Sequence, residues 1–307
     1  MKFRFRVLAA ACLSVSLRAQ LVERPLVTGR EVMVTSLDPL ASMAGFRILE
    51  QGGNAFDAAV AAAMTITVVD PRMSSIGGQG FATIYVAGSR QVRALNFFGP
   101  APGSASAEAL KGKDYTRGIL STPVPSCLRG YWELHRRYGK LKWAQVVQPA
   151  LELAEHGFIM TPSLSDDIRD DRALLLQFPS SARVLLPGGK VPEPGELFVQ
   201  RDLARTLQRI AEKGADDFYS GGIADRIAAF FREQGGLITK QDLAVYQPKW
   251  VDPISTTYRG CTFYTQPPNS SGIAVLEQLN LLEGFDLRKL GHNTPQYLYI
   301  VGEAMRL

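Results

Sequence analysis

A turn rich in serine is the first feature whose residue types could carry chemistry. Residues 267–272 are Pro-Pro-Asn-Ser-Ser-Gly, and they precede a segment with helical hydrophobic spacing. Hydroxyl groups and free backbone N–H groups at a helix start can bind an anion. The pattern is more typical of an ordinary helix N-cap, and neither Ser270 nor Ser271 has the Gly-x-Ser-x-Gly context of a nucleophilic serine. We therefore expect a structural role for this turn.

A glycine-rich bend at residues 74–80 is the second candidate, because it contains Gly77, Gly78 and Gly80. A dinucleotide-binding loop would need a further glycine at position 83 and would open a helix. Position 83 is Thr83, and the residues after the bend alternate like a strand. The pattern argues against nucleotide binding, and we expect these glycines to permit a close backbone approach.

Clusters of charged residues are expected to form solvated helix faces rather than catalytic pairs. One cluster mixes acidic residues with arginines: Asp166, Asp167, Arg169, Asp170, Asp171 and Arg172. Another is basic: Arg136, Arg137, Lys140 and Lys142. His292 lies in a predicted loop, where we expect a structural role.

Three cysteines and three histidines show no spacing typical of metal ligands, so we expect neither a metal nor another cofactor. Cys127 and Cys261 could pair in an oxidising compartment or could both stay reduced.

The first nineteen residues have the pattern of an export signal. Basic residues within Met1–Arg6 precede an apolar run at 7–17, and Ala19 offers a cleavage point. The run is shorter than the roughly 20 residues that span a bilayer, and no later segment predicts a membrane span. We expect a signal peptide at 1–19 and a periplasmic or secreted protein; a frayed N-terminal helix or strand is the alternative.

The net charge of +5 arises mainly in this N-terminal segment. Four basic residues lie within it, out of 34 basic and 29 acidic residues in the whole chain. The remainder is therefore nearly neutral, which argues against nucleic acid as a partner.

Hydrophobic periodicity predicts the elements that must position these residues. Strands are expected at 31–36, 81–86 and 92–98, and a hairpin at 254–265. Helices are expected at 39–49, 55–68, 141–156, 203–213, 223–234, 273–283 and from 295 onward. The region from about 104 to 246 is mainly helical, and Pro149 is expected to break or kink its helix. This order indicates a layered α/β (α+β) fold with helices packed on a sheet. The last helix still carries its apolar stripe at Leu307, so we expect the parent polypeptide to continue.

Several stretches, taken in order, resemble the gamma-glutamyltransferase (glutathione hydrolase) family. The most distinctive are QGGNAFDAAVA at 51–61 and IGGQGF at 76–81. The full set of similar stretches is 41–69, 75–81, 123–157, 215–219, 235–246, 258–260, 267–272 and 282–307.

The resemblance implies a partial αββα sandwich of the N-terminal-nucleophile hydrolase type with a helical insert, over residues 20–307. It also implies a precursor that cuts itself before a threonine. That threonine then attacks a γ-glutamyl amide such as glutathione, with its own α-amino group as base, and the acyl group passes to water or to an acceptor. The nucleophile would lie beyond Leu307, so no catalytic residue is expected in this chain, which should be inactive alone. Its expected partner is the C-terminal small subunit of the same precursor.

Phe98 is the one candidate substrate-binding residue, because it stands where the family has an arginine that grips the α-carboxylate of the γ-glutamyl group. Phenylalanine cannot form a bidentate pair with a carboxylate. This difference favours the branch that resembles cephalosporin acylases and other amidohydrolases. Two alternatives stay open: Arg90 or Arg93 could supply the grip after a shift in register, or the chain could be a non-catalytic binding protein.

Overall fold

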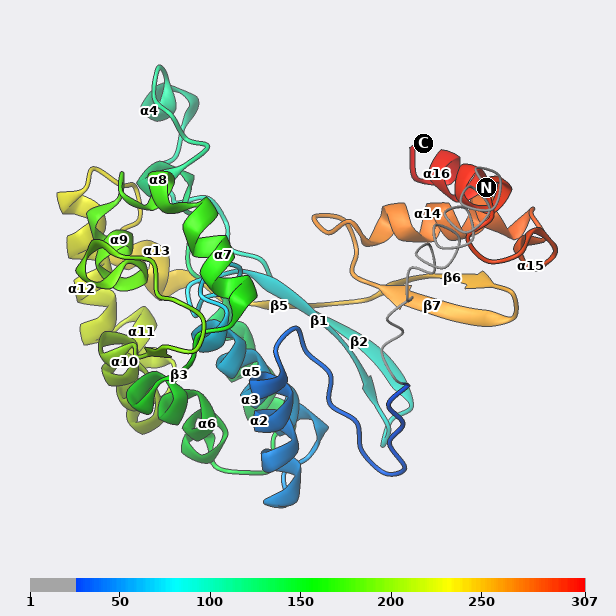
Figure 1. The fold of residues 1–307 in the computed structure, drawn as a ribbon, viewed down its shortest axis with the longest axis horizontal. Coiled ribbons are helices and arrows are strands. Elements are labelled where there is room, and N and C mark those ends of the chain that lie inside the picture. The colour runs from blue at the N-terminus through cyan, green and yellow to red at the C-terminus, as the bar shows by residue number, and fades with distance from the viewer. Residues whose placement is uncertain (1–25, 307) are drawn as a thin grey trace, which may run out of the picture. The chain divides into compact units, whose positions relative to one another are not determined.

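The structure, a computed structural model, describes residues 26–306 of the chain (Figure 1). The predicted signal peptide at 1–19 lies outside the described residues. Residues 26–33 carry no helix or strand and belong to a separate unit from Val34–Leu307. The prediction of a strand at 31–36 was wrong, because this segment is in no sheet. Alternating apolar residues form a strand only where a neighbouring strand accepts their hydrogen bonds.

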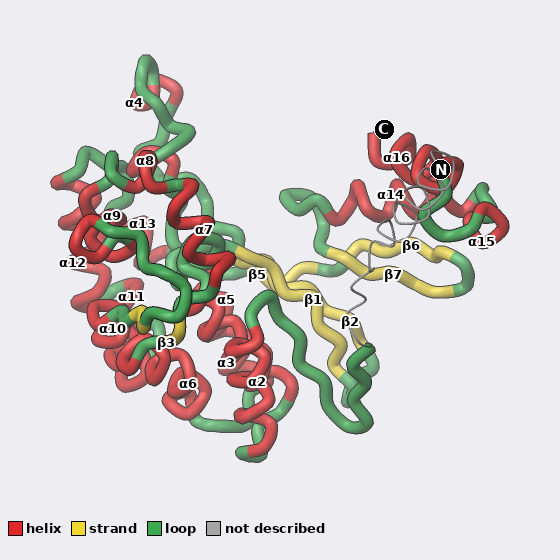
Figure 2. Tube along the Cα trace, viewed as in Figure 1, coloured by secondary structure: helices red, strands yellow, loops and turns green. Residues whose placement is uncertain are grey.

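Helices dominate the second unit, as Figure 2 shows in red. The first helices in chain order are α2 (Pro39–Glu50), α3 (Ala55–Val69), α4 (Ala107–Leu110), η1 (Gly118–Ser121), α5 (Cys127–Tyr138), α6 (Trp143–His156), α7 (Pro162–Asp170) and α8 (Arg172–Leu175). They are followed by α9 (Pro179–Leu185), η2 (Pro187–Gly189), α10 (Arg201–Lys213), α11 (Asp216–Tyr219), α12 (Gly222–Glu233), α13 (Lys240–Val245), α14 (Gly272–Glu283), α15 (Leu287–Leu290) and α16 (Pro295–Arg306). None of these described helices is long and apolar enough to cross a membrane.

The described strands form three small antiparallel sheets. Their strands are β1 (Gly80–Val86), β2 (Gln91–Phe97), β3 (Phe158–Ile159), β4 (Leu197–Phe198), β5 (Lys249–Val251), β6 (Ile254–Tyr258) and β7 (Cys261–Thr265). The largest sheet has the order β1-β2-β5, while β3-β4 and β6-β7 are separate pairs. The α/β class is therefore confirmed in its coarse form, as a mixed and mostly helical chain.

A buried carboxylate ties the start of α3 to the turn between α5 and α6. Asn54 caps α3, and the Asp57 carboxylate accepts a hydrogen bond from the Asn54 N–H at 2.9 Å. The same carboxylate accepts from the backbone N–H of Lys140 at 3.0 Å and of Leu141 at 3.3 Å. These bonds offset the cost of burying the carboxylate. They also fix the start of α3 relative to the turn between α5 and α6.

Helix α6 continues through Pro149, so of the two predicted outcomes, a break or a kink, the break was wrong. Proline inside a helix costs about 3 kcal/mol, because it removes one N–H donor and crowds the preceding turn. Here Pro149 is buried, and α6 packs against α3 and α10 with Val146, Val147 and Ala150 fully covered. Burial of this apolar face offsets the local cost.

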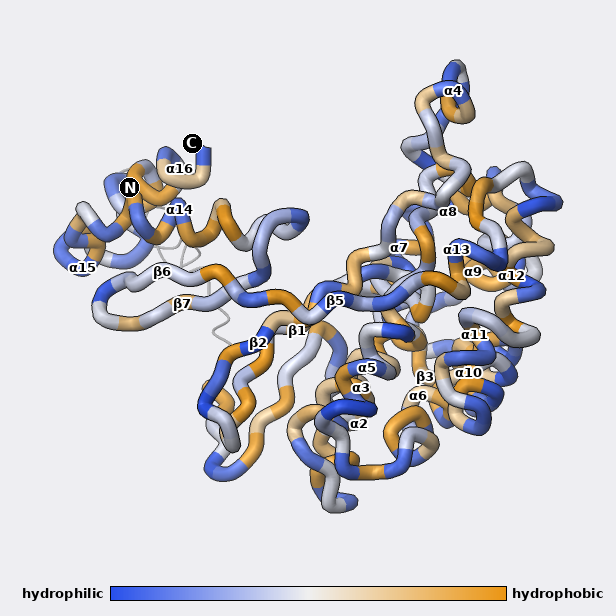
Figure 3. Tube along the Cα trace, turned by 180° about the vertical axis from the view of Figure 1, so that it is seen from behind, coloured by the Kyte–Doolittle hydropathy of each residue, from blue (hydrophilic) through white to orange (hydrophobic). Residues whose placement is uncertain are grey.

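The β1-β2 hairpin packs one face on α5. Gly80 pairs with Phe97 across the two strands, and the Phe97 ring is only 5% exposed. A Cβ added to Gly80 would lie 2.5 Å from this ring, and one added to Gly130 of α5 would lie 2.3 Å from it. Hydrophobic and hydrophilic residues intermix along β2 (Figure 3), and its residues are more buried toward its C-terminal end.

Cys127 and Cys261 are both free thiols, the first buried and the second exposed. Burial raises the pKa of the Cys127 thiol, although a hydrogen bond with Tyr131 partly opposes the shift. Because the thiolate is the reactive form, Cys127 is expected to be inert.

The first testable prediction concerns the fit between α5 and the Phe97 ring. Replacing Gly130 with alanine forces a methyl group into this ring, so we expect a loss of about 1–3 kcal/mol in the free energy of unfolding. The matched control is Gly302→Ala in α16, where an added Cβ meets nothing within 4 Å and a neutral or stabilising effect is expected. Urea unfolding measures both; equal stability of the two variants would contradict the packing argument.

The second prediction separates the two thiols. In a Cys12→Ser background, a thiol reagent at pH 8 should label Cys261 rapidly, whereas Cys127 should react only after denaturation. A Cys261→Ser control should then show no rapid labelling. Rapid labelling of native Cys127 would show that its surroundings open readily.

Candidate functional site

Phe97 and Phe98 point to opposite sides of the β1-β2 hairpin, because successive residues at a strand end alternate. Phe97 is buried against α5, whereas Phe98, immediately after β2, is 43% exposed. The Phe98 ring stacks on the Phe81 ring of β1, with centroids 5.6 Å apart and planes 23° apart. The position singled out in the sequence therefore forms half of an aromatic pair on the side away from α5.

The backbone on both sides of Phe98 is held by neighbouring side chains. Its N–H donates to Asn96 Oδ1 at 3.0 Å, and the N–H of Gly99 donates to Gln79 Oε1 at 3.1 Å. Gly99 also lies against the carbonyl of Val124: a Cβ at position 99 would be 2.0 Å from that oxygen. The chain direction after β2 is thus fixed without any contribution from the side chain of residue 98.

An amide pair borders the aromatic pair. Asn96 Nδ2 donates to Asn269 Oδ1 at 2.8 Å, and Asn269 has a left-handed backbone with φ of 82°. Asn96 is the cross-strand partner of Phe81, so it lies on the same face of the hairpin as the aromatic pair. This corner therefore combines two aromatic rings with neutral hydrogen-bonding groups.

The serine-rich turn contributes structure rather than a free hydroxyl at residue 270. Ser270 Oγ donates toward the carbonyls of Gln266 and Pro267 and accepts from the N–H of Gly272 at 3.2 Å. Ser271 occupies the N-cap position of α14 without a side-chain capping bond. Gln266 joins the turn to β1, because its Nε2 donates to the Ala82 carbonyl at 2.9 Å. The predicted structural role is confirmed, with Ser270 rather than Ser271 bonding the helix start.

Neither alternative arginine lies beside Phe98. Arg93 is five positions earlier and so points to the other face of β2, where its guanidinium lies 6.0 Å from the centre of the Trp250 ring. Arg90 lies in the turn at the far end of the hairpin with φ of 52°. The seven residues of β2 lie between Arg90 and Phe98, and eight steps along a strand span about 26 Å.

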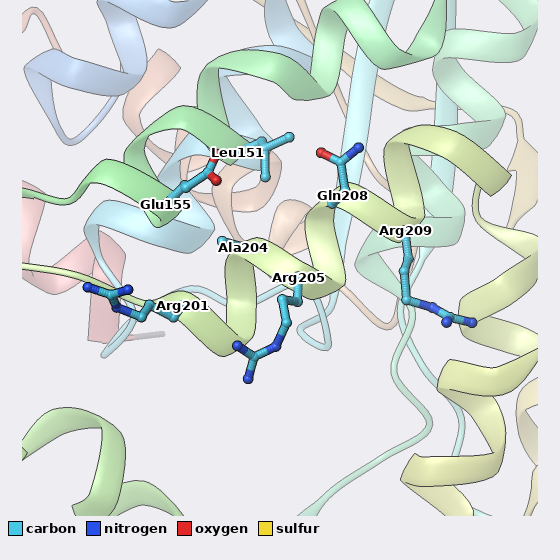
Figure 4. Close-up of a pocket in the computed structure, with 7 residues that line it drawn as sticks. All are labelled: Leu151, Glu155, Arg201, Ala204, Arg205, Gln208 and Arg209. Carbon is cyan, nitrogen blue, oxygen red and sulfur yellow. The ribbon is translucent and has the colours of Figure 1, made fainter.

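Arginines do gather elsewhere, in a groove between α6 and α10 (Figure 4). Arg209 donates two hydrogen bonds to the Asp217 carboxylate, and Arg205 pairs with Asp202. Glu155 also lines the groove. Acidic groups already compensate these cations, and the helix that packs on both strands of the β1-β2 hairpin is α5 rather than α10. The groove therefore does not replace a cation at position 98.

The remaining sequence candidates have the structural surroundings expected of them. The acidic cluster lies on and just after α7, where Asp167 and Asp171 pair with Arg72. The basic cluster is exposed near the end of α5 and after it, and the exposed His292 packs edge-on against Tyr297. The glycine bend approaches the start of α5: the Gly78 carbonyl accepts from the N–H groups of Ser126 and Cys127. No group of residues in the described part of the chain could hold a metal ion.

Three residues of the corner at Phe98 were missed by sequence reasoning: Gln79, Asn96 and Asn269. Gln79 lies within the distinctive IGGQGF stretch, so its position was a usable signal. Asn269 is 173 positions from Asn96, and no local pattern predicts that these two amides meet.

Comparison with known proteins supports this description. The family model described as Gamma-glutamyltranspeptidase matches residues 41–307. "Acylase ACY 1 proenzyme" of Pseudomonas sp. (strain SE83) is 39% identical over 299 residues, which covers 93% of this chain and 53% of that protein. "Glutathione hydrolase proenzyme" of Escherichia coli is 36% identical over 287 residues, covering 91% of this chain and 49% of that protein.

Solved structures agree with the sequence matches. The gamma-glutamyltranspeptidase of Helicobacter pylori is similar with a TM-score of 0.87 and 37% identity, covering 92% of this chain and 83% of that one. The cephalosporin acylase of Bacillus halodurans is similar with a TM-score of 0.81 and 35% identity, covering 93% of this chain and 56% of that one. The chain spans about half the length of the curated relatives it matches. It belongs to the gamma-glutamyltranspeptidase family, and it matches the N-terminal portion of that family's proenzymes.

Proposed function

We propose that this chain is the large-subunit part of an exported, self-processing amidohydrolase or acyltransferase whose acyl group is not γ-glutamyl. The observation that carries the proposal is the Phe81–Phe98 stack at the position where the family has its carboxylate-binding arginine. The threonine nucleophile belongs to the C-terminal part of the precursor, as the family resemblance implies. This chain contributes the acyl-binding corner.

The proposed preference follows from the electrostatics of the corner. A charge-assisted hydrogen bond to a carboxylate contributes about 1.5–3 kcal/mol, which corresponds to roughly 10- to 150-fold in affinity. Phe98 supplies none of this, and Arg93 lies on the other face. A γ-glutamyl group placed here would bury its α-carboxylate against a ring, which is unfavourable without a partner.

A neutral acyl group suits the same corner. An apolar chain or ring can pack on the exposed face of Phe98, and the amides of Asn96 and Asn269 border it. Two acylase proenzymes among the relatives, from Pseudomonas strains SE83 and V22, are 37–39% identical to this chain. Their names support an acylase-type activity, while the glutathione hydrolase proenzymes among the relatives keep γ-glutamyl transfer as the alternative.

The C-terminal part of the same precursor is the proposed protein partner. The contacting helices α14 and α16 expose apolar side chains, among them Val275, Leu281, Leu298, Tyr299 and Met305. Exposed apolar patches of this kind are typical of interaction surfaces. Export to the periplasm or beyond is part of the proposal and rests on the signal-peptide pattern at 1–19.

The third prediction tests substrate preference in the full-length enzyme. Replacing Phe98 with arginine restores a carboxylate-binding cation, so the ratio of kcat/KM for γ-glutamyl-p-nitroanilide to that for a neutral acyl-p-nitroanilide should rise about tenfold or more. Tyr85→Arg is the matched control, because it adds the same charge on the same hairpin face at the opposite end of β1. A ratio that is unchanged in Phe98→Arg, or raised equally by Tyr85→Arg, would refute the role of residue 98.

The fourth prediction tests the proposed processing. Expression of the full reading frame should yield two chains, and N-terminal sequencing of the smaller one should find threonine first. Replacing that threonine with alanine should leave a single uncut precursor. Two chains from the alanine variant would assign the cut to another protease.

A further inference from the structure

A cleft formed by η1, the start of α9 and the end of α12 is not used by the proposed function. Its volume is about 630 Å³, within the usual range of 300–1,000 Å³ for small-molecule sites. None of the residues that line it is charged. An ionic ligand would lose its hydration there without gaining a counter-charge.

Two aromatic walls of the cleft are held in place by glycines. Gly118 has φ of 73°, and a Cβ at this position would lie 2.8 Å from the Phe178 ring. A Cβ at Gly236 would lie 2.5 Å from the Phe231 ring and 2.6 Å from Ile119. The rings of Phe178 and Phe231 therefore pack directly on the backbone, which restricts their motion and makes these walls rigid.

A third ring of the cleft, that of Phe230, is partly exposed to solvent. Phe230 is 40% exposed, while the adjacent Phe231 is buried. Their centroids are 6.3 Å apart at an angle of 82°, so the two rings form an edge-to-face pair. A ligand ring seated in the cleft would meet Phe230 at its edge or face, an arrangement that aromatic groups favour.

Neutral polar groups accompany these rings. Ser180, Ser181 and Gln234 line the cleft, and their side chains make no hydrogen bond with the rest of the described chain. Hydroxyl and amide groups of this kind bind neutral donors and acceptors such as an amide or an alcohol. Three rings with a few convergent polar groups are the usual composition of a ligand site.

We propose that this cleft binds a neutral small molecule that carries an aromatic ring and an amide or hydroxyl group. The uncharged lining selects against ions, the fixed rings of Phe178 and Phe231 form the walls, and Phe230 supplies the stacking contact. Gln234 pairs with the amide or hydroxyl of the ligand.

The fifth prediction uses N-acetyl-L-phenylalaninamide as the probe and the purified full-length protein, with calorimetric titration as the measurement. Saturable binding is expected, and Phe230→Ala should weaken it about three- to tenfold. The matched control is Phe285→Ala, since Phe285 is similarly exposed but lies outside the cleft. The charged analogue N-acetyl-L-phenylalanine should bind more weakly than the amide.

Three results would overturn the proposal. They are the absence of saturable binding at the solubility limit of the probe, equal binding by Phe230→Ala, and equal binding of the charged analogue. A concentration-dependent dimer in sedimentation velocity that Phe230→Ala abolishes would instead assign the cleft to a second copy of the chain. If circular dichroism shows that Phe230→Ala is unfolded, Gln234→Leu provides the test, with the same weakening expected from loss of the amide.

Discussion

The packing of the Phe97 ring between two glycines is the constraint on which the candidate site depends. The ring lies so close to Gly80 of β1 and Gly130 of α5 that neither of these two positions has room for a side chain. Because Phe97 is fixed toward the helix, strand alternation directs its neighbour to the other face. The character of the site then depends on which side chain follows Phe97 in the sequence.

Two polar side chains hold the backbone that follows Phe97. Gln79 and Asn96 bind the N–H groups of Gly99 and Phe98, at a point where strand pairing with β1 has ended. Without the bond to Gln79, the part-buried N–H of Gly99 would lack a partner, which costs free energy. The corner is therefore ordered by its surroundings, and ordering of this kind favours selective binding.

Local patterns predicted both hairpins and all described helices of twelve or more residues except α5, because caps and periodicity act within a few residues. The structure shows such local signals in the capping boxes at Asn54 and Thr239 and in Arg259, which has φ of 49° in the β6-β7 turn. Two predictions failed for tertiary reasons: burial keeps α6 intact at Pro149, and the segment at 31–36 belongs to none of the described sheets. Phe98 could be singled out only by resemblance to a family. Its contact with Phe81 required the register of β1 and β2, and the Asn96–Asn269 bond required the fold of distant segments.

The backbone around residue 98 is secured entirely by other residues, and this has an evolutionary consequence. A single codon there can exchange a ring for a cation while the flanking hydrogen bonds and the approach of Gly99 to Val124 stay intact. Members of the family could thus differ in substrate preference while the fold around residue 98 stays the same. One ancestral fold could in this way give rise to family members that bind different acyl groups.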